Sequence, residues 1–190
     1  MFDQITIIGC GLIGSSIFKA LKKKSSIKKI ITFDNNKSVM EVIKKYNLSD
    51  EMVSSPADAV KNSDLVLIST PSSSFSSVMN EIKGSLKNGS ILTDTLSVKK
   101  GQKPKLEDIN WIPSHPVAGT EKSGPLAGQE NLFENRWTII TPGKNTKDSD
   151  TKKVSLFWET LGSKVKIMSP EEHDKILSIT SHLPHVVAYN

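Results

Sequence analysis

The residue best placed for proton chemistry is His115, which follows a short apolar segment and precedes Pro116. A following proline biases the backbone toward an extended conformation. Imidazole titrates near neutrality, so His115 can act as a general base; the alternative is a loop histidine that makes a structural hydrogen bond. Ser97 lies one predicted loop earlier and could hydrogen-bond His115 or a substrate hydroxyl. Its alternative role is to form a turn or a helix cap before Lys99.

Two further histidines, His182 and His185, are three residues apart on the last predicted helix and therefore share a face. Such a pair can bind a metal ion, but no carboxylate or cysteine is spaced to complete the ligand set. A substrate-facing or hydrogen-bonded pair is the favoured interpretation, and no metal site is predicted. Pro184 lies between them and should kink the helix because it removes one helical hydrogen bond.

A glycine-rich turn could bind a phosphate. Gly9, Gly11 and Gly14 have the spacing G-x-G-x-x-G, between an apolar β-branched run and a helix-compatible segment at 15–24. In a strand–turn–helix unit, the first glycine permits the turn, the second lets the backbone approach a pyrophosphate, and the third lets the helix pack closely. The alternative is a structural turn that binds nothing. The context on both sides favours a dinucleotide site.

An acidic residue supports the dinucleotide site: Asp34 ends the next apolar run, twenty residues after Gly14. A carboxylate there bonds the ribose hydroxyl and repels a 2′-phosphate, which favours NAD. Lys37 could partly offset that repulsion, so NADP stays an alternative. The residues predicted to bind the cofactor are Gly9, Gly11, Leu12, Ile13, Gly14, Asp34, Ser69, Thr70 and Pro71.

Strands that alternate with helices must position these residues. The continuous apolar run at 64–68 is typical of a central parallel strand that is buried on both faces. The alternation predicts an α/β fold with a doubly wound, mostly parallel sheet. Ligands bind outside the carboxyl ends of such strands. This rule selects the loops at 9–14, 34–37, 69–75, 94–99 and 115–124.

Some segments carry local predictions. The serine-rich stretch at 72–77 is predicted to be a loop that caps an amphipathic helix at 78–86. A short strand is predicted at 110–114, and an edge strand with alternating polarity at 164–168. The last helix is predicted over 169–190, because its first four residues, Ser-Pro-Glu-Glu, supply a cap, an N1 proline and a capping-box glutamate.

Composition excludes several classes of protein. The net charge is +5, but only one of the 25 basic residues is arginine and the lysines are spread along the chain, so an anionic small molecule is a better partner than nucleic acid. The single cysteine, Cys10, excludes an internal disulfide. No apolar run approaches the ~18 residues of a membrane span, and no signal segment is visible. A cytoplasmic protein without a membrane partner is predicted.

Four strings occur in order: G-x-G-x-x-G-S at 9–15, T-D-x-x-S-V-K at 93–99, HPVAGTEKSG at 115–124 and SHLPH at 181–185. Together they resemble the prephenate dehydrogenase family, the oxidoreductases of tyrosine biosynthesis. The resemblance extends over essentially the whole chain. The two histidine-containing strings are far more specific than the glycine fingerprint, and they favour the catalytic interpretation of His115.

The resemblance implies NAD-dependent oxidative decarboxylation of prephenate to 4-hydroxyphenylpyruvate, with arogenate as a related substrate. It implies that the residue matching His115 takes the hydroxyl proton, and that the residue matching Ser97 hydrogen-bonds both the hydroxyl and the histidine. Many relatives carry a glycine before this serine, where the chain has Leu96, and this change could alter the loop. The residues implied to bind the substrate are Thr120, Glu121, His182 and His185.

The resemblance also implies two domains: a Rossmann-like dinucleotide-binding domain at 1–168 and, at 169–190, the start of a helical substrate and dimerisation domain that is incomplete. We expect a homodimer only when the rest of that domain is supplied. In the family this domain supplies an arginine for a substrate carboxylate, whereas the only arginine of the chain, Arg136, lies in the first domain. The alternative is therefore a dinucleotide-binding module without turnover. A different hydroxy-acid dehydrogenase on the same fold is less favoured.

Overall fold

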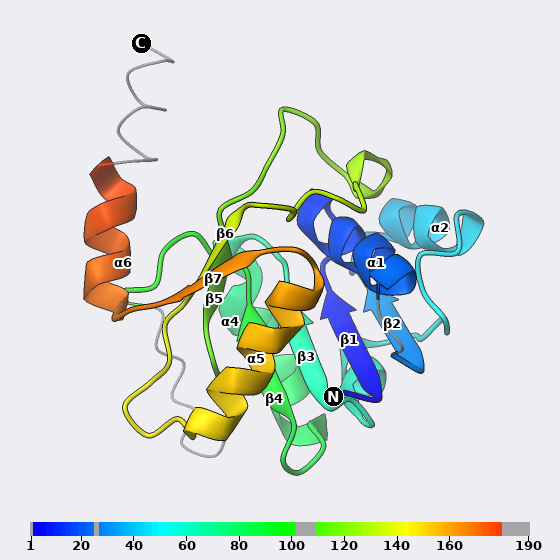
Figure 1. Cartoon of the computed structure of the whole chain (residues 1–190). Helices are drawn as coiled ribbons and strands as arrows, with labels where there is room; N and C mark the ends of the chain where they lie inside the picture. The colour runs from blue at the N-terminus through cyan, green and yellow to red at the C-terminus, as the bar shows by residue number, and fades with distance from the viewer. Residues whose placement is uncertain (1, 25–26, 102–108, 180–190) are drawn as a thin grey trace.

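The computed structural model describes residues 2–24, 27–101 and 109–179, with helices on both faces of a mostly parallel sheet (Figure 1). The strands are β1 (Gln4–Ile8), β2 (Lys29–Phe33), β3 (Leu65–Ile68), β4 (Ile91–Asp94), β5 (Ser114–Pro116), β6 (Trp137–Ile140) and β7 (Lys164–Ile167). The α-helices are α1 (Leu12–Lys24), α2 (Lys37–Lys45), α3 (Pro56–Val60), α4 (Ser72–Ile82), α5 (Asp148–Thr160) and α6 (Pro170–Leu177). Two 3₁₀ turns are η1 (Lys83–Ser85) and η2 (Pro125–Ala127).

The strands form two sheets that lie next to each other at β4 and β5. Four parallel strands have the order β2-β1-β3-β4, and three further strands have the order β5-β6-β7. Among the described strand pairs, only β5 and β6 are antiparallel, and a parallel bridge between Leu92 and Trp111 connects the two sheets. The chain thus reaches β5 in the same direction as β4, so the carboxyl ends of β1, β3, β4 and β5 face one edge. The predicted doubly wound, mostly parallel α/β fold is confirmed.

Each central strand is buried on both faces, because its side chains alternate between two apolar cores. On one face, Ile5 and Ile7 pack with the apolar side chains of α1 and α5. On the other face, Ile8 and Val66 pack with those of α3 and α4. The sheet is therefore fixed from both sides, and the loops at its carboxyl edge are held on a rigid frame.

The serine-rich stretch differs from its prediction, because it forms the first turns of α4 rather than a capping loop. Pro71 is the N-cap residue, and the exposed serines follow it within the helix. The apolar side that anchors α4 begins at Phe75 and continues through Met79 and Ile82, all of which are buried. This helical spacing outweighs the low helix propensity of serine. Likewise, α1 begins at Leu12, directly after the turn, and not at Ser15.

The two predicted short strands and the last predicted helix can also be compared with the structure. The strand predicted at 110–114 lies later, at Ser114–Pro116, and Trp111 makes only the single bridge to β4. The edge strand is confirmed as β7. Ser169 caps α6 with the predicted capping box, and α6 is described to Leu177; residues 180–190 lie outside the described part.

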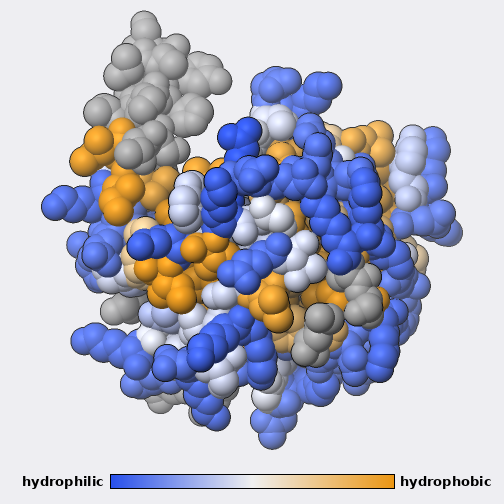
Figure 2. Space-filling view, viewed as in Figure 1, coloured by the Kyte–Doolittle hydropathy of each residue, from blue (hydrophilic) through white to orange (hydrophobic). Residues whose placement is uncertain are grey.

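The surface of α6 and its surroundings is partly apolar, as the orange areas at the left of Figure 2 show. Ile167 of β7 and Ile176 of α6 are among the exposed large apolar side chains. No helix among the described residues combines the length and the apolar character that crossing a membrane requires.

Candidate active site

The glycine turn between β1 and α1 has the geometry that its spacing predicts. Gly9 has a φ of +95°, and a Cβ there would lie 2.5 Å from the Ser69 carbonyl oxygen. A Cβ on Gly14 would lie 2.0 Å from the Gly9 carbonyl oxygen, so the close approach of α1 requires glycine. A Cβ on Gly11 would meet nothing within 4 Å, so this backbone faces open space. The first turn of α1 carries no acidic residue, which leaves its positive end available to a phosphate.

A pocket of about 200 Å³ lies at this turn. Six of the predicted cofactor residues line it, namely Gly9, Gly11, Asp34, Ser69, Thr70 and Pro71. Leu12 and Ile13 do not line it but pack against the apolar core, and Gly14 is buried beneath the turn. The sequence did not predict Asn35, Pro56 and Val78, which also line the pocket and come from the loop after β2, from the start of α3 and from α4.

The polar groups of this pocket fit a dinucleotide. Asp34 accepts hydrogen bonds from the amides of Cys10 and Asn36, each at 2.9 Å, so its carboxylate is held at the end of β2 opposite the glycine turn. The Thr70 hydroxyl is buried and has no hydrogen-bond partner within the described part of the chain. A carboxylate for a ribose, an unpartnered hydroxyl and an open helix N-terminus are suitable neighbours for a nucleotide.

Cys10 lies inside the turn and is inert. Its thiol is buried, and this burial, together with the negative charge of Asp34, raises its pKa to about 12. The thiolate is therefore scarcely present at neutral pH. Cys10 acts as a small apolar residue inside the glycine turn.

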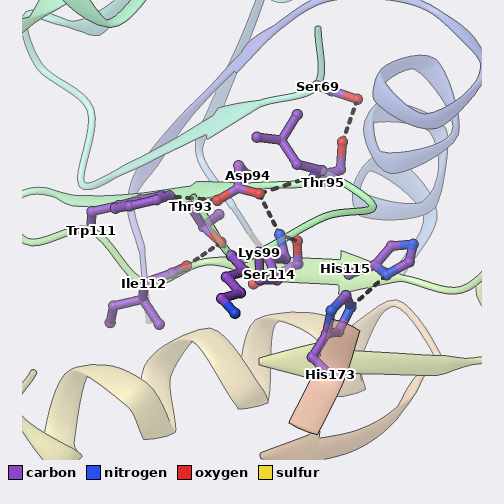
Figure 3. A network of polar contacts seen from close by, with 12 residues as sticks. Ser69, Thr93, Asp94, Thr95, Lys99, Trp111, Ile112, Ser114, His115 and His173 are labelled. Carbon is purple, nitrogen blue, oxygen red and sulfur yellow. Dashed lines mark hydrogen bonds and ion pairs between the residues drawn. The ribbon is translucent and has the colours of Figure 1, made fainter. Parts of the chain in front are cut away.

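A polar network connects the cofactor pocket with the surroundings of His115 (Figure 3). The Thr95 hydroxyl donates to the Ser69 hydroxyl at 3.2 Å, which joins the end of β4 to the loop after β3. Asp94 of β4 accepts from the Trp111 indole at 2.9 Å and from the Lys99 ammonium at 2.6 Å. The network therefore begins at the Ser69 wall of the pocket and continues under the loop that follows β4.

Lys99 and Asp94 form a buried ion pair that sequence reasoning missed. Their side chains are 2% and 0% exposed, and the Lys99 ammonium also donates to the Ser114 carbonyl oxygen, next to His115. Burial lowers the pKa of Lys99, although the Asp94 carboxylate opposes that shift. A charge buried this deeply is stable only when it is paired. The pair fixes the loop that carries Ser97 against β5.

His115 is buried in β5, where it lies opposite Ile139 of β6. Its Nδ1 is 2.8 Å from Nε2 of His173, which α6 places beside it (Figure 3). His173 is completely buried, and its Nδ1 lies 2.7 Å from a carboxylate oxygen of Asp174. The predicted base thus belongs to a His–His–Asp chain. The sequence contains both partners at the start of a well-capped helix, but nothing in their spacing indicates the contact with β5.

Asp174 also binds the loop after β4. Its carboxylate accepts from the backbone amides of Lys99 at 2.9 Å and Lys100 at 2.8 Å. Burial alone would raise the pKa of Asp174, but the hydrogen bonds from the Lys99 amide, from His173 and from the Lys100 amide outweigh it, and the pKa is lowered. Asp174 is therefore a carboxylate at neutral pH.

Ser97 lies in that loop, and no hydrogen bond joins its side chain to His115. Its side chain is exposed and makes no hydrogen bond to any residue between 2 and 24, 27 and 101, or 109 and 179. Leu96 is buried in the core beneath α4, and this anchoring leaves the next residue facing outward. A hydrogen bond from Ser97 to the histidine is thus not seen, and its contact with a substrate hydroxyl stays a prediction.

The other predicted substrate residues are less well placed by the structure. Thr120 and Glu121 are exposed in the loop after β5, at the carboxyl edge, and the Thr120 hydroxyl accepts from the Lys122 amide at 3.2 Å. His182 and His185 lie outside the described residues. Within the described ranges, no three histidine, cysteine or acidic side chains come together in a way that could hold a metal ion.

Comparisons with known proteins identify the family to which these features belong. The nucleotide-binding domain of prephenate dehydrogenase matches residues 17–167, and the dimerization domain of the same enzymes matches residues 169–190. The chain belongs to the prephenate dehydrogenase family. The resemblance drawn from the four sequence strings is thereby confirmed. The family domain that covers most of the chain contains the pocket wall at Asp34, the buried Lys99–Asp94 pair and His115.

Several prephenate dehydrogenase relatives agree in sequence and in fold. Cyclohexadienyl dehydrogenase of Zymomonas mobilis is 38% identical over 100% of this chain and 66% of its own length. Prephenate dehydrogenase of Bacillus subtilis is 33% identical over 99% of this chain and 52% of its own length. The crystal structure of prephenate dehydrogenase from Aquifex aeolicus, in complex with hydroxyphenyl propionate and NAD+, has a TM-score of 0.91 and is 33% identical, over 100% of this chain and 68% of that one. The chain thus spans about half to two thirds of the length of these proteins.

Proposed function

We propose that this chain performs the NAD-dependent oxidative decarboxylation of prephenate to 4-hydroxyphenylpyruvate. The observation that carries the proposal is the placement of His115 at the sheet edge that also holds the glycine turn, with its ring nitrogen already engaged by His173 at 2.8 Å. The family membership and the NAD+ in the Aquifex aeolicus complex support the cofactor. NADP is the alternative, because Lys37 is exposed near Asp34.

The cofactor half of the reaction is assigned to the pocket at β1, β2 and β3. The positive end of α1 and the open backbone at Gly11 are suited to the pyrophosphate. Asp34 is suited to the ribose hydroxyls, and Ser69, Thr70 and Pro71 form the wall that leads toward the network of Figure 3. When bound, the nicotinamide accepts a hydride from the ring carbon that carries the substrate hydroxyl.

His115 handles the proton of that hydroxyl. As the hydride leaves carbon, His115 takes the hydroxyl proton and the carbinol becomes a ketone. The carboxylate on the opposite ring carbon then leaves as carbon dioxide, and its bonding electrons make the ring aromatic as a phenolate. No net proton is released, so the protonated His115 returns its proton to the phenolate oxygen. One histidine therefore acts first as base and then as acid.

The remaining predicted residues are assigned to the substrate. We assign Ser97 to the substrate hydroxyl, because its exposed side chain belongs to a loop that is fixed beside His115. Thr120, Glu121, His182 and His185 are assigned to the rest of the substrate. We also assign residues 1–168 to the dinucleotide-binding domain and 169–190 to the helical domain.

The test is to incubate the purified chain with prephenate and NAD and to follow the absorbance of reduced nicotinamide. Turnover that depends on both compounds, with 4-hydroxyphenylpyruvate as the product, is the expected result. NAD binding without turnover would instead support the alternative of a dinucleotide-binding module. Parallel assays with arogenate and with NADP measure the preference for each substrate and cofactor.

A further inference from the structure

The His115–His173–Asp174 chain fixes where the protons on the two imidazole rings lie. Two ring nitrogens that are 2.8 Å apart can hydrogen-bond only if one carries a proton and the other does not. The Asp174 carboxylate, 2.7 Å from Nδ1 of His173, is an acceptor, so His173 donates from Nδ1. When His173 is neutral, its Nε2 has no proton and accepts one from Nδ1 of His115.

We propose that His173 and Asp174 are positioning residues that hold His115 in the tautomer with the proton on Nδ1, so that Nε2 is the basic nitrogen. The tautomer is a property of the folded chain. Only its catalytic consequence rests on the proposed function. In this form His115 presents a lone pair on Nε2 to a substrate hydroxyl. The opposite tautomer would present an N–H there and could not take a proton.

Asp174 couples this tautomer to the loop of Ser97. Its two carboxylate oxygens accept from His173 and from the Lys99 and Lys100 amides, so one side chain holds both the histidine chain and the loop. The Lys99 ammonium donates to Asp94 and to the Ser114 carbonyl oxygen. Asp174 is an anion in direct contact with His173. When His115 accepts a proton at Nε2, its Nδ1–H bond to His173 strengthens, because the donor becomes charged.

The direct test is nuclear magnetic resonance of the ring nitrogens in the chain labelled with ¹⁵N-histidine. The chain has four histidines, and the signals of His115 are identified by their loss in a His115→Asn variant. At a pH where His115 is neutral, its Nδ1 is expected to carry the proton and its Nε2 to be bare. A His115 that carries its proton on Nε2 in the unaltered chain would overturn the proposal.

Two substitutions at position 173 test the cause. His173→Leu removes the nitrogen that accepts from His115 Nδ1, so the Nδ1–H tautomer loses this stabilisation and the proton is expected to move to Nε2. His173→Gln supplies a side-chain oxygen that can accept from Nδ1, and it is expected to restore the original tautomer. Lys175→Gln, an exposed position on the same helix, is the matched control and should leave the ring signals unchanged. Retention of the Nδ1–H form in a folded His173→Leu variant would contradict the role of His173.

Kinetics of the same variants separate this proposal from the proposed function. His173→Leu is expected to lower kcat for prephenate about 10- to 100-fold, with the KM for NAD unchanged and substantial recovery in His173→Gln. Turnover combined with an Nε2–H tautomer would leave the proposed function intact and overturn this inference. The Nδ1–H tautomer without turnover would support this inference and contradict the proposed function. If His173→Leu does not fold, the spectrum of the unaltered chain still decides the question.

Discussion

His115 shows how a residue type alone leaves its chemistry open. An imidazole in a β-strand can be a base, a donor or a structural partner, and its neighbours decide which. Here the imidazole of His173 lies 2.8 Å from Nδ1 of His115, and the carboxylate of Asp174 lies 2.7 Å from the other ring nitrogen of His173. Asp34 is similar, because two backbone amides fix its carboxylate where a ribose would lie.

Replacement of the base should affect chemistry and not cofactor binding. His115→Asn is expected to reduce hydride transfer by ~10²–10⁴, the usual contribution of general acid–base catalysis. NAD affinity should stay close to that of the unaltered chain, because His115 does not line the cofactor pocket. Single-turnover kinetics and a fluorescence titration with NAD measure the two quantities. An equal loss of NAD binding would indicate a structural role for His115.

Replacement of the acidic residue should change the choice of cofactor. Asp34→Ala is expected to weaken NAD more than NADP, because it removes both the acceptor for the ribose and the charge that repels a 2′-phosphate. Asp34→Asn is the matched control, since it keeps the shape and one oxygen but removes the charge. The ratio of the two dissociation constants is the measurement. An unchanged ratio in both variants would show that Asp34 does not select the cofactor.

At the scale of elements, β1 and α1 form one closely packed unit. The turn between them leaves no room for a Cβ at Gly14, the third glycine. A methyl group on Gly14 would lie 2.0 Å from a backbone oxygen, whereas one on Gly11 would meet no described atom within 4 Å. Substitution at Gly14 therefore tests the packing of the turn, and substitution at Gly11 tests the binding of the proposed ligand. The same unit fixes the edge at which the later loops gather.

Alanine substitutions at these two glycines should affect different properties, stability at Gly14 and NAD binding at Gly11. Gly14→Ala is expected to lower the free energy of unfolding by about 1–3 kcal/mol or more, because backbone must move to admit the methyl group. Gly11→Ala should leave the thermal unfolding midpoint nearly unchanged but weaken NAD binding, since its methyl group would occupy the space proposed for the pyrophosphate. Calorimetry and NAD titration test the pair. Full NAD affinity in Gly11→Ala would contradict the proposed pyrophosphate site.

At the scale of the whole molecule, carboxylates connect segments that are far apart in the sequence. Asp64, at the start of β3, accepts from the amides of Asp3 and Gln4 and from Lys87. Asp174 connects α6 to the loop after β4 in the same way. Burial alone would raise the pKa of both carboxyls, but these hydrogen bonds lower it. The fold is therefore closed partly by charge-assisted hydrogen bonds.

Stability should accordingly fall in acid. Because the pKa of these carboxyls is lower in the folded chain, the unfolded chain binds protons first as the pH decreases. Their contribution is present above about pH 4 and is lost as the pH falls through the folded pKa values. Urea unfolding between pH 7 and pH 2 should show this loss, with a shallower pH dependence in Asp174→Asn. An equal dependence in that variant would contradict the contribution of Asp174.

Local patterns predicted much of this molecule. Three features depend on neighbouring residues alone, so the local sequence is sufficient to predict them: the strand–glycine–helix unit, the buried central strand and the capping box at Ser169. The serine-rich start of α4 was wrongly predicted because its helix is held by Phe75, Met79 and Ile82 against the sheet. The helix propensity of the single residues does not reflect that tertiary packing.

By itself, the sequence determined the fold class, the family and the candidate base, because these depend on short strings and on a regular alternation of elements. Only the tertiary structure placed His173 and Asp174 beside His115, and Lys99 under the loop of Ser97. The first contact joins residues 58 positions apart, and the amide of Lys99 reaches Asp174 over 75 positions. Contacts over such distances arise from the packing of α6 against β5 and the β4 loop, which local spacing does not encode. The same packing sets the hydrogen-bond pattern of His115.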